Sequence, residues 1–262
     1  MMTPDEILMT IESSAKPASG TGAIPSSTAR VLPSLHSVLA QFAPLPRSAL
    51  FLGLANDGLP VLLNLSDPLP GPVMIAGDEG SGKTNFLRTI SCALDQVRSA
   101  GAVSYSVISS QLSEWRESEI GRNRENLFSP REASTAEYLH SLVVWAHTHK
   151  SAQRVFLLLI DHFETLLEDA QGGQDLRWLL LRGPSRCLWP IVAINSSIAV
   201  SKAFGPWLDF FRTRLFGSIR DQRQAQTLTG FSNVSFTNSV PGFQFAMREG
   251  NDWLPFWIPT LD

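Results

Sequence analysis

The chain has 262 residues, of which 44% are hydrophobic and 17% are charged, and its formal net charge is −3. It is long enough to bury one sizeable core, and although the length permits two small domains we expect one. The charge gives no overall attraction to polyanions, so a contact with nucleic acid would need a local patch or an assembly. Two cysteines form neither a metal motif nor a disulfide framework.

The first 30 residues predict a flexible arm. Residues 13–27 read SSAKPASGTGAIPSS, which has too little apolar surface to order itself. The opening MMTPDEILMT lacks the basic start and apolar run of a secretory signal, and no apolar run approaches the ~20 residues of a membrane helix. We therefore expect a soluble cytoplasmic protein with no membrane segment in this chain, and a single domain over residues 31–262.

This domain begins with a helical pattern at residues 31–42 and two apolar runs at 50–65 around the tip Asn56, Asp57 and Gly58, which predicts a hairpin. Strand and helix patterns then alternate, which predicts a mostly parallel sheet flanked by helices. A second hairpin pattern at 243–259 predicts antiparallel strands at the sheet edge. In between, residues 111–132 carry charges of both signs and suit a solvated or intersubunit surface. The alternating elements are strands at 72–77, 102–110, 154–161 and 189–197, and helices at 83–97, 134–149 and 173–182.

The segment GDEGSGKT, residues 77–84, matches GxxxxGK[ST] and lies between a predicted strand and helix, the context that this motif requires. Its glycines allow successive N–H groups to surround phosphates at a helix N-terminus, where the dipole favours negative charge. Lys83 would neutralise the β- and γ-phosphates of ATP, and the Thr84 hydroxyl would hold Mg²⁺. The residues expected to bind nucleotide are Gly77, Asp78, Glu79, Gly80, Ser81, Gly82, Lys83, Thr84 and Asn85.

The most hydrophobic strand pattern, VFLLLI, ends at Asp161. A charge there is costly unless it points into a polar site at the C-terminal edge of the sheet. Since the phosphate loop lies at such an edge, we expect Asp161 to contact Mg²⁺ through water. The alternative is that Asp161 caps a helix over residues 162–169, and both roles are compatible.

The group that positions the attacking water is less evident. His162 is a poor base, because anions around a metal-bound phosphate favour its protonated form. Glu164 is the candidate, since a helix that starts at Asp161 brings the third following residue back to the same face. The alternative for Glu164 is a solvated residue that complements the helix dipole.

The sequence resembles the FtsK/SpoIIIE and HerA group of P-loop ATPases over most of residues 52–259. The group has a strand hairpin shortly before the phosphate loop, and here LGLANDGLPVLLNL precedes PGPVMIAGDEGSGKT in the same order. Three further stretches are similar to the group's pattern, namely RGPSRCLWPIVAINSS, FRTRLFGSIRDQRQAQTLTG and PGFQFAMREGNDWLPFWIP.

This resemblance implies a RecA-like core that assembles as a ring, binds ATP between neighbours and moves DNA or a protein substrate. Carried over by position, Asn195 or Ser196 is near the polar residue that senses the γ-phosphate. Arg182 or Arg186, and less securely Arg212 or Arg214, are placed to reach a neighbour's nucleotide, or else are surface arginines.

The sequence also departs from the group. Its motors usually have Asp-Glu at the strand end, whereas His162 follows Asp161, and the sensor glutamine is not evident at INSS. The sequence therefore predicts an ATPase subunit in a homo-oligomer or a hetero-oligomer with other ATPase subunits. The alternatives are a nucleotide-binding assembly scaffold with little or no hydrolysis and, third, a P-loop kinase.

Overall fold

The computed structural model of the protein describes residues 32–97, 102–116, 121–148, 154–167 and 172–261. The predicted flexible arm, residues 1–30, lies outside the described residues. In the part of the chain that the structure describes, no helix combines the length and the apolar character that crossing a bilayer requires.

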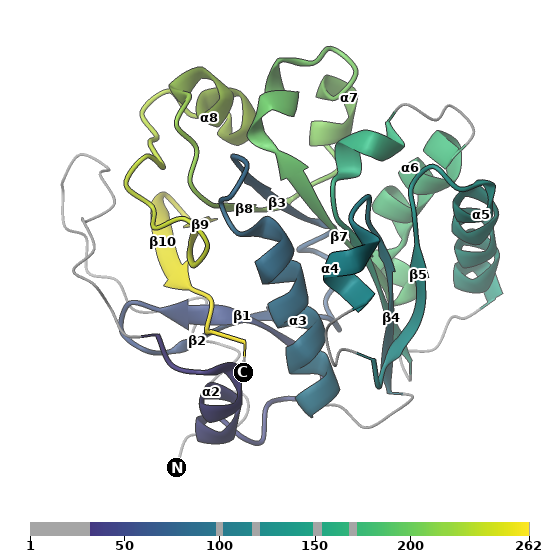
Figure 1. The fold of residues 1–262 in the computed structure, drawn as a ribbon, viewed down its shortest axis with the longest axis horizontal. Helices are drawn as coiled ribbons and strands as arrows, with labels where there is room; N and C mark the ends of the chain where they lie inside the picture. Colours follow the sequence, from purple (N-terminus) through teal and green to yellow (C-terminus); the bar gives the residue numbers. More distant parts are fainter. Residues whose placement is uncertain (1–31, 98–101, 117–120, 149–153, 168–171, 262) are drawn as a thin grey trace.

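Ten strands form one sheet in the order β2-β1-β10-β9-β8-β3-β7-β6-β4-β5 (Figure 1). The six strands from β8 to β5 pair in parallel, whereas β2, β1, β10 and β9 pair antiparallel with one another, and β9 joins β8 antiparallel. The strands are β1 (Ala49–Ala55), β2 (Pro60–Asn64), β3 (Val73–Gly77), β4 (Val103–Ile108), β5 (Arg124–Phe128), β6 (Val155–Ile160), β7 (Leu188–Asn195), β8 (Thr213–Phe216), β9 (Gln244–Glu249) and β10 (Asp252–Trp257).

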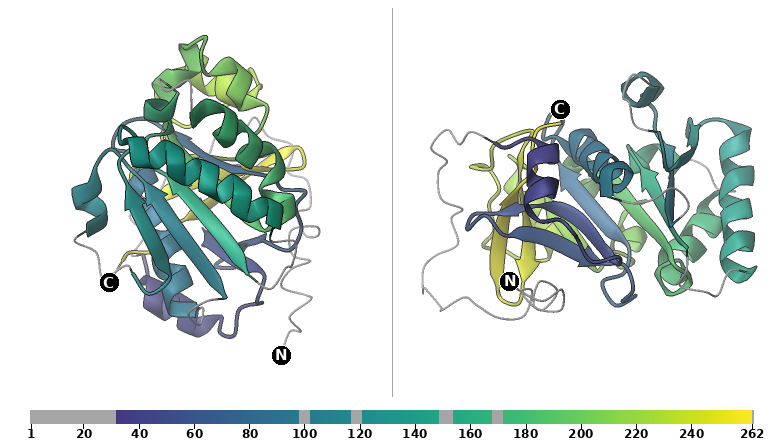
Figure 2. Two further views of the ribbon diagram at one scale, coloured as in Figure 1. Left: turned by 90° about the vertical axis from the view of Figure 1, so that its right-hand side faces the viewer. Right: turned by 90° about the horizontal axis from the view of Figure 1, so that it is seen from below.

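Helices lie on both sides of the sheet (Figure 2). The long helix α3 starts at Lys83 and ends at Val97, as the sequence predicts. Three 3₁₀ turns follow strands or helices: η1 (Phe163–Leu166), η2 (Pro184–Arg186) and η3 (Ser196–Val200). The α-helices are α2 (Leu35–Gln41), α3 (Lys83–Val97), α4 (Leu112–Arg116), α5 (Ala133–Thr148), α6 (Gly172–Arg182), α7 (Gly205–Leu208) and α8 (Gln222–Thr229).

The central strands are buried on both faces, which explains why their sequences are continuous apolar runs. In β3, Val73 and Ile75 belong to the core under α3, while Met74 and Ala76 belong to the core shared with α5 and α6. A smaller cluster joins α2 to β1 and β2.

The predicted fold class is confirmed: the sheet is mostly parallel, flanked by helices, and carries antiparallel hairpins at one end. One detail differs, because the last hairpin does not form the outermost pair. Its strand β10 pairs with β1, so that β2 is the edge. The sequence also gave no prediction of β5 and β8, which are short strands of four or five residues.

Parallel pairing aligns the strand ends that carry the predicted site. Gly77 at the end of β3 pairs with Asn195 at the end of β7, and Ile108 at the end of β4 pairs with Ile160 of β6. Residues that are far apart in the sequence therefore meet at one edge of the sheet, where ligands bind in folds of this class.

Candidate nucleotide-binding site

The phosphate loop connects β3 directly to α3, and two of its glycines adopt conformations that other residues rarely reach. Gly80 has φ of 75° and Gly82 has φ of 94°. A Cβ atom on Gly77 would lie 2.4 Å from the Ser81 Oγ atom, so this position also excludes a side chain. The loop thus presents its N–H groups at the start of a 15-residue helix, which is the geometry of an anion site.

The Lys83 ammonium lies inside this loop. Its Nζ atom donates hydrogen bonds to the carbonyl oxygens of Gly77 at 3.0 Å and Asp78 at 2.7 Å. Burial lowers the pKa of Lys83, and four nearby carboxylates oppose that shift. In order of strength these are Glu164, Asp161, Asp78 and Glu79. One cation therefore faces four anionic side chains.

Thr84 and Asp161 meet although 77 positions separate them in the sequence. The Thr84 Oγ1 atom donates a hydrogen bond of 3.0 Å to Asp161 Oδ2. The Asp161 side chain is 1% exposed, and Ser109 Oγ and Trp115 Nε1 each lie 3.5 Å from the same Oδ2 atom. In the alternative interpretation Asp161 caps the following turn, but His162 occupies the cap position and makes no side-chain cap bond there.

These two side chains fit a magnesium ion. A hydroxyl and a carboxylate are the oxygen donors that Mg²⁺ prefers, and it usually completes its shell with water and phosphate oxygens. Within the described residues, the hydrogen-bond partners of this buried carboxylate are neutral hydroxyl and indole groups. A cation at this position would offset the cost of burying it.

The turn after Asp161 places Glu164 beside the phosphate loop. His162 has φ of 60° and ψ of 56°, a left-handed conformation that turns the chain into η1. Its Nδ1 atom lies 3.6 Å from Asp161 Oδ1. The Glu164 Oε2 atom is buried and has no hydrogen-bond partner among the described residues. A buried carboxylate oxygen without a partner is costly, and a water molecule or a ligand would satisfy it.

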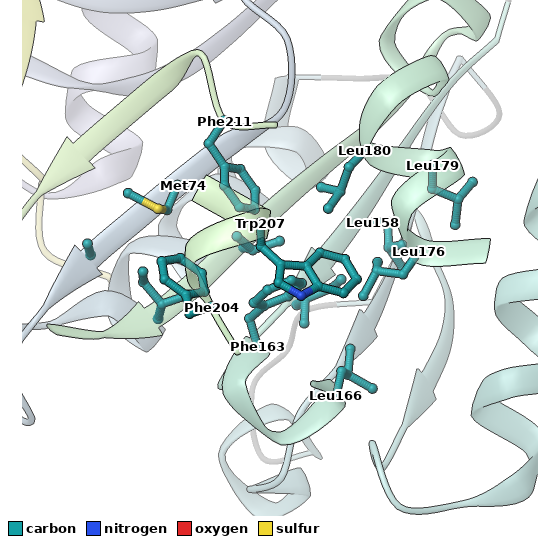
Figure 3. Packing of buried hydrophobic residues seen from close by; sticks show 14 of the residues in the cluster. Met74, Leu158, Phe163, Leu166, Leu176, Leu179, Leu180, Phe204, Trp207 and Phe211 are labelled. Atoms are coloured by element: carbon teal, nitrogen blue, oxygen red, sulfur yellow. The ribbon is translucent and has the colours of Figure 1, made fainter. Parts of the chain in front are cut away.

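Aromatic packing fixes this turn (Figure 3). The Phe163 ring makes edge contacts with the rings of Trp207, Phe211 and Phe204, at centroid distances of 5.5, 6.0 and 6.5 Å. Phe163 is fully buried, so its side chain anchors η1 in the hydrophobic core. The neighbouring Glu164 is thereby held in place by the core.

The two sensor candidates at the end of β7 behave differently. The Asn195 Oδ1 atom accepts a hydrogen bond of 3.0 Å from the Ser197 N–H and so caps η3. The Ser196 hydroxyl instead donates a hydrogen bond to the Asp78 carboxylate of the phosphate loop. Of the pair that the sequence left open, Ser196 is thus the one that contacts the loop.

The candidate arginines lie away from this chain's own phosphate loop. Arg182 ends α6 and Arg186 ends η2, just before β7 begins, whereas the loop lies where the aligned strand β7 ends. Arg214 donates to the carbonyl oxygens of Phe211, Leu228 and Leu208, each at 2.9 Å, and burial lowers its pKa. Arg214 therefore has a structural role, whereas Arg182 and Arg186 lie at the opposite edge of the sheet from the chain's own loop.

Sequence reasoning missed three contributors to the site. Ser109 and Trp115 surround Asp161, and the signal for Ser109 was its position at the end of the strand that neighbours β6. Gly242, just before β9, donates its N–H to the Ser81 carbonyl at 3.0 Å and accepts from Asn85 Nδ2 at 3.4 Å. No local pattern links Gly242 to a loop some 160 residues earlier.

The comparisons with known proteins agree with this geometry. The family model of the NACHT domain matches residues 71–198, just under half of the chain. No curated protein matches the sequence. Among solved structures, the chain is similar to EccC (ATPases 2 and 3) of Thermomonospora curvata in complex with a signal sequence peptide. The TM-score is 0.67 at 15% identity, over 93% of this chain and 46% of that one.

Two further structures are similar. EssC (ATPases 2 and 3) from Geobacillus thermodenitrificans has a TM-score of 0.66 at 13% identity, over 82% of this chain and 45% of that one. The pCW3 conjugation coupling protein TcpA, in its monomer form with ATPγS, has a TM-score of 0.68 at 11% identity, over 89% of this chain and 71% of that one.

The chain spans less than half the length of the EccC and EssC structures that it matches. At these identities the likeness concerns the fold, and at that level the resemblance to the FtsK/SpoIIIE and HerA group is confirmed. The phosphate-loop motif, the strand order and these neighbours agree: the chain has the RecA-like fold of P-loop NTPases.

Proposed function

We propose that the protein is an ATP-binding, ATP-hydrolysing subunit of an FtsK/HerA-like motor, and that it acts in a ring-shaped oligomer. The observation that carries this proposal is the 3.0 Å hydrogen bond between Thr84 Oγ1 and Asp161 Oδ2. In P-loop NTPases these are the positions that hold the magnesium ion of the bound nucleotide. The two side chains are already in contact at the mouth of the phosphate loop.

The charge of the site supports a nucleotide that arrives with its metal. Four carboxylates around Lys83 would repel free ATP, which is itself an anion. Thr84 and Asp161 would hold the Mg²⁺ that accompanies the nucleotide, and this ion would supply positive charge that offsets the phosphate charge. Lys83 would exchange the two loop carbonyls that it now contacts for phosphate oxygens.

Glu164 is proposed to position the attacking water. Its Oε2 atom has no partner among the described residues, it lies near enough to Lys83 to affect the pKa of that side chain, and Phe163 anchors the turn that carries it. A water molecule held by this oxygen would face the γ-phosphate end of the nucleotide. A carboxylate in this position would orient the water and accept its proton.

The ring is proposed because the candidate arginines lie at the far edge of the sheet from the chain's own loop. Arg182 or Arg186 would then complete the site of a neighbouring subunit, in a homo-oligomer or in a hetero-oligomer with other ATPase subunits. DNA or a protein substrate is the proposed cargo, and the cytoplasm the proposed location, since ATP is present there. Light scattering with and without Mg²⁺ and ATP tests the assembly.

A second candidate is a nucleotide-dependent assembly scaffold with little turnover. The observation that favours it is His162, which occupies the position of the usual glutamate and has the left-handed backbone of the η1 cap. In that case bound ATP would stabilise the oligomer without being consumed.

Nucleotide affinity and hydrolysis, measured for three proteins, separate the candidates. Lys83→Ala removes charge-assisted hydrogen bonds to phosphate worth about 1.5–3 kcal/mol each, so ATP affinity should fall roughly a hundredfold. Glu164→Gln should bind ATP within about threefold of the wild type. A motor loses hydrolysis in both variants, whereas a scaffold has little to lose in either.

The exposed Lys202→Ala is a matched control for the loss of one ammonium. It should bind and hydrolyse ATP as the wild type does. If Lys83→Ala binds ATP as tightly as Lys202→Ala, the loop does not hold phosphate and the proposal is wrong.

A further inference from the structure

The Asp78 carboxylate joins the phosphate loop to two other segments. Its Oδ1 atom accepts a hydrogen bond from the Ser196 hydroxyl, and its Oδ2 atom accepts one of 2.9 Å from the Arg220 N–H. The Asp78 N–H in turn donates to the Ser218 carbonyl at 2.9 Å. The ends of β3, β7 and β8 are thus tied together through one residue.

This carboxylate is unfavourable for the proposed ligand. Asp78 contributes to the negative charge around Lys83, and a side chain of the same sign as a phosphate weakens its binding. Both of its oxygens are used in the contacts to Ser196 and Arg220. These two hydrogen bonds are the favourable contribution of the Asp78 side chain to the site.

The two segments that Asp78 joins also meet each other. Ser196, which is 1% exposed, begins η3. Arg220 precedes Asp221, whose side chain caps α8 by accepting from the N–H groups of Arg223 and Gln224. Helix α8 packs against η3. A movement of the phosphate loop would therefore be transmitted to η3 through the Ser196 hydrogen bond and to α8 through the Arg220 hydrogen bond.

We propose that Asp78 is a positioning residue: it holds Ser196 and the Ser218–Arg220 turn against the phosphate loop, so that the site distinguishes a nucleotide with a γ-phosphate from one without it. The inference rests on the proposed function, because it specifies how the same site recognises its nucleotide. Asp78 acts through Ser196 rather than by touching the nucleotide.

Substituting Asp78 and its neighbour Glu79 in turn distinguishes the positioning role of Asp78 from the effect of its negative charge on nucleotide affinity. Asp78→Ala and Glu79→Ala each remove one carboxylate, and Glu79 is exposed and its side chain makes no hydrogen bond within the described part of the chain. Loss of charge alone should strengthen binding, more for ATPγS than for ADP. Loss of the hydrogen bonds to Ser196 and Arg220 should weaken binding, more for ATPγS than for ADP. The two variants are therefore expected to change the ratio of ATPγS to ADP affinity in opposite directions.

Calorimetry with Mg²⁺ and either ATPγS or ADP measures this ratio. We expect Asp78→Ala to lower it about tenfold, corresponding to the loss of one or two hydrogen bonds. Glu79→Ala should raise it, because it removes a negative charge and no hydrogen bond. Asp78→Asn, which loses the charge but keeps groups able to contact Ser196 and Arg220, should stay within about threefold of the wild type.

The inference is overturned if Asp78→Ala and Glu79→Ala shift the ratio in the same direction, or if Asp78→Ala weakens ATPγS and ADP equally. A wild type that binds neither nucleotide refutes the proposed function instead. That result is distinguishable, because it appears before any variant is compared.

Ser196→Ala provides a second test that does not depend on the folding of Asp78→Ala. It removes one contact and keeps the carboxylate, so the affinity ratio should fall about threefold. In the double variant the two effects should not add, since each substitution breaks the same contact. Additive effects, or a ratio in Ser196→Ala equal to that of the wild type, would refute a role through Ser196.

Discussion

The parallel and antiparallel parts of the sheet contribute differently to the site. In the parallel part, chain direction brings Gly77, Asp161 and Ser196 to one edge from three separate strand ends. In the antiparallel part, strands alternate in direction, so each edge receives hairpin tips such as Asn56 to Gly58. The comparison teaches that the chemical groups of this site come from parallel topology, whereas the hairpins serve mainly to close and support the sheet.

One contact crosses between the two parts. Gly242, at the start of the last hairpin, donates its N–H to the Ser81 carbonyl, and Gly82 lies so close that a Cβ atom there would be 2.5 Å from the Gly242 Cα. The antiparallel part therefore braces the phosphate loop through backbone atoms. Variants on either side of this contact test how separate the two parts are.

The largest effect is expected at the proposed metal site, in the parallel part. Removing Mg²⁺ with a chelator should weaken ATP binding to the wild type by about a hundredfold, because Lys83 is then the one cation to offset the repulsion between the phosphates and the four carboxylates around it. In Asp161→Asn this dependence on Mg²⁺ should shrink to about threefold, since an amide is a weaker ligand. Titration calorimetry with and without the metal measures both values.

Asp252→Asn is the control, since Asp252 is an exposed carboxylate at the hairpin between β9 and β10. Its affinities should equal those of the wild type in both conditions. If the ATP affinity of Asp161→Asn depends on Mg²⁺ as strongly as that of the wild type, the metal binds elsewhere. The ends of the parallel strands would then not supply its ligands.

The next effect is at the contact between the two parts. Gly82→Ala adds a methyl group at φ of 94° and 2.5 to 2.7 Å from three atoms of Gly242. We expect a loss of about 3 kcal/mol in the free energy of unfolding, from backbone strain plus the clash. Urea denaturation measures it.

Gly80→Ala measures the cost of backbone strain without a clash, because Gly80 has φ of 75° but no atom lies within 4 Å of an added Cβ. It should lose only about 1 kcal/mol. Equal losses in the two variants would show that Gly242 does not press on the loop and that the two parts are independent there.

A smaller effect is expected inside the antiparallel part. A Cβ atom on Gly53 of β1 would lie 2.6 Å from the Trp257 carbonyl oxygen of β10. Gly53→Ala should therefore lower the free energy of unfolding by about 2 kcal/mol while ATP affinity stays within about twofold. A large loss of affinity in the folded variant would mean that strain in the hairpins reaches the phosphate loop.

Of the six strands in the parallel part, the sequence predicted β3, β4, β6 and β7, because their signals are local. The bounds of α3 follow from the glycine loop before Lys83 and the apolar spacing within the helix, and the strand ending before Asp161 follows from six consecutive apolar residues. Both signals lie within one element and need no knowledge of its neighbours.

What could not be predicted depends on neighbours distant in the sequence. The four-residue strand β8 is a strand only because β3 and β9 pair with it. Asn195 and Ser196 are adjacent, and which side chain faces the loop is decided by the cap that Asn195 forms on η3. The brace at Gly242 likewise arises because β9, which follows it, pairs with β8, and β8 pairs with β3, the strand that leads into the loop.

The smallest effect is expected at the tip of the first hairpin. The Trp257 Nε1 atom donates a hydrogen bond of 2.9 Å to Asn56 Oδ1, which links the hairpin tip to β10. Asn56→Ala should lower the free energy of unfolding by about 1 kcal/mol, and Asn56→Asp, which keeps the acceptor oxygen, should lose less. ATP affinity should match the wild type in both. If Asn56→Ala instead alters the ratio of ATPγS to ADP affinity, the hairpins take part in nucleotide recognition, and the division between a chemical part and a supporting part of the sheet is wrong.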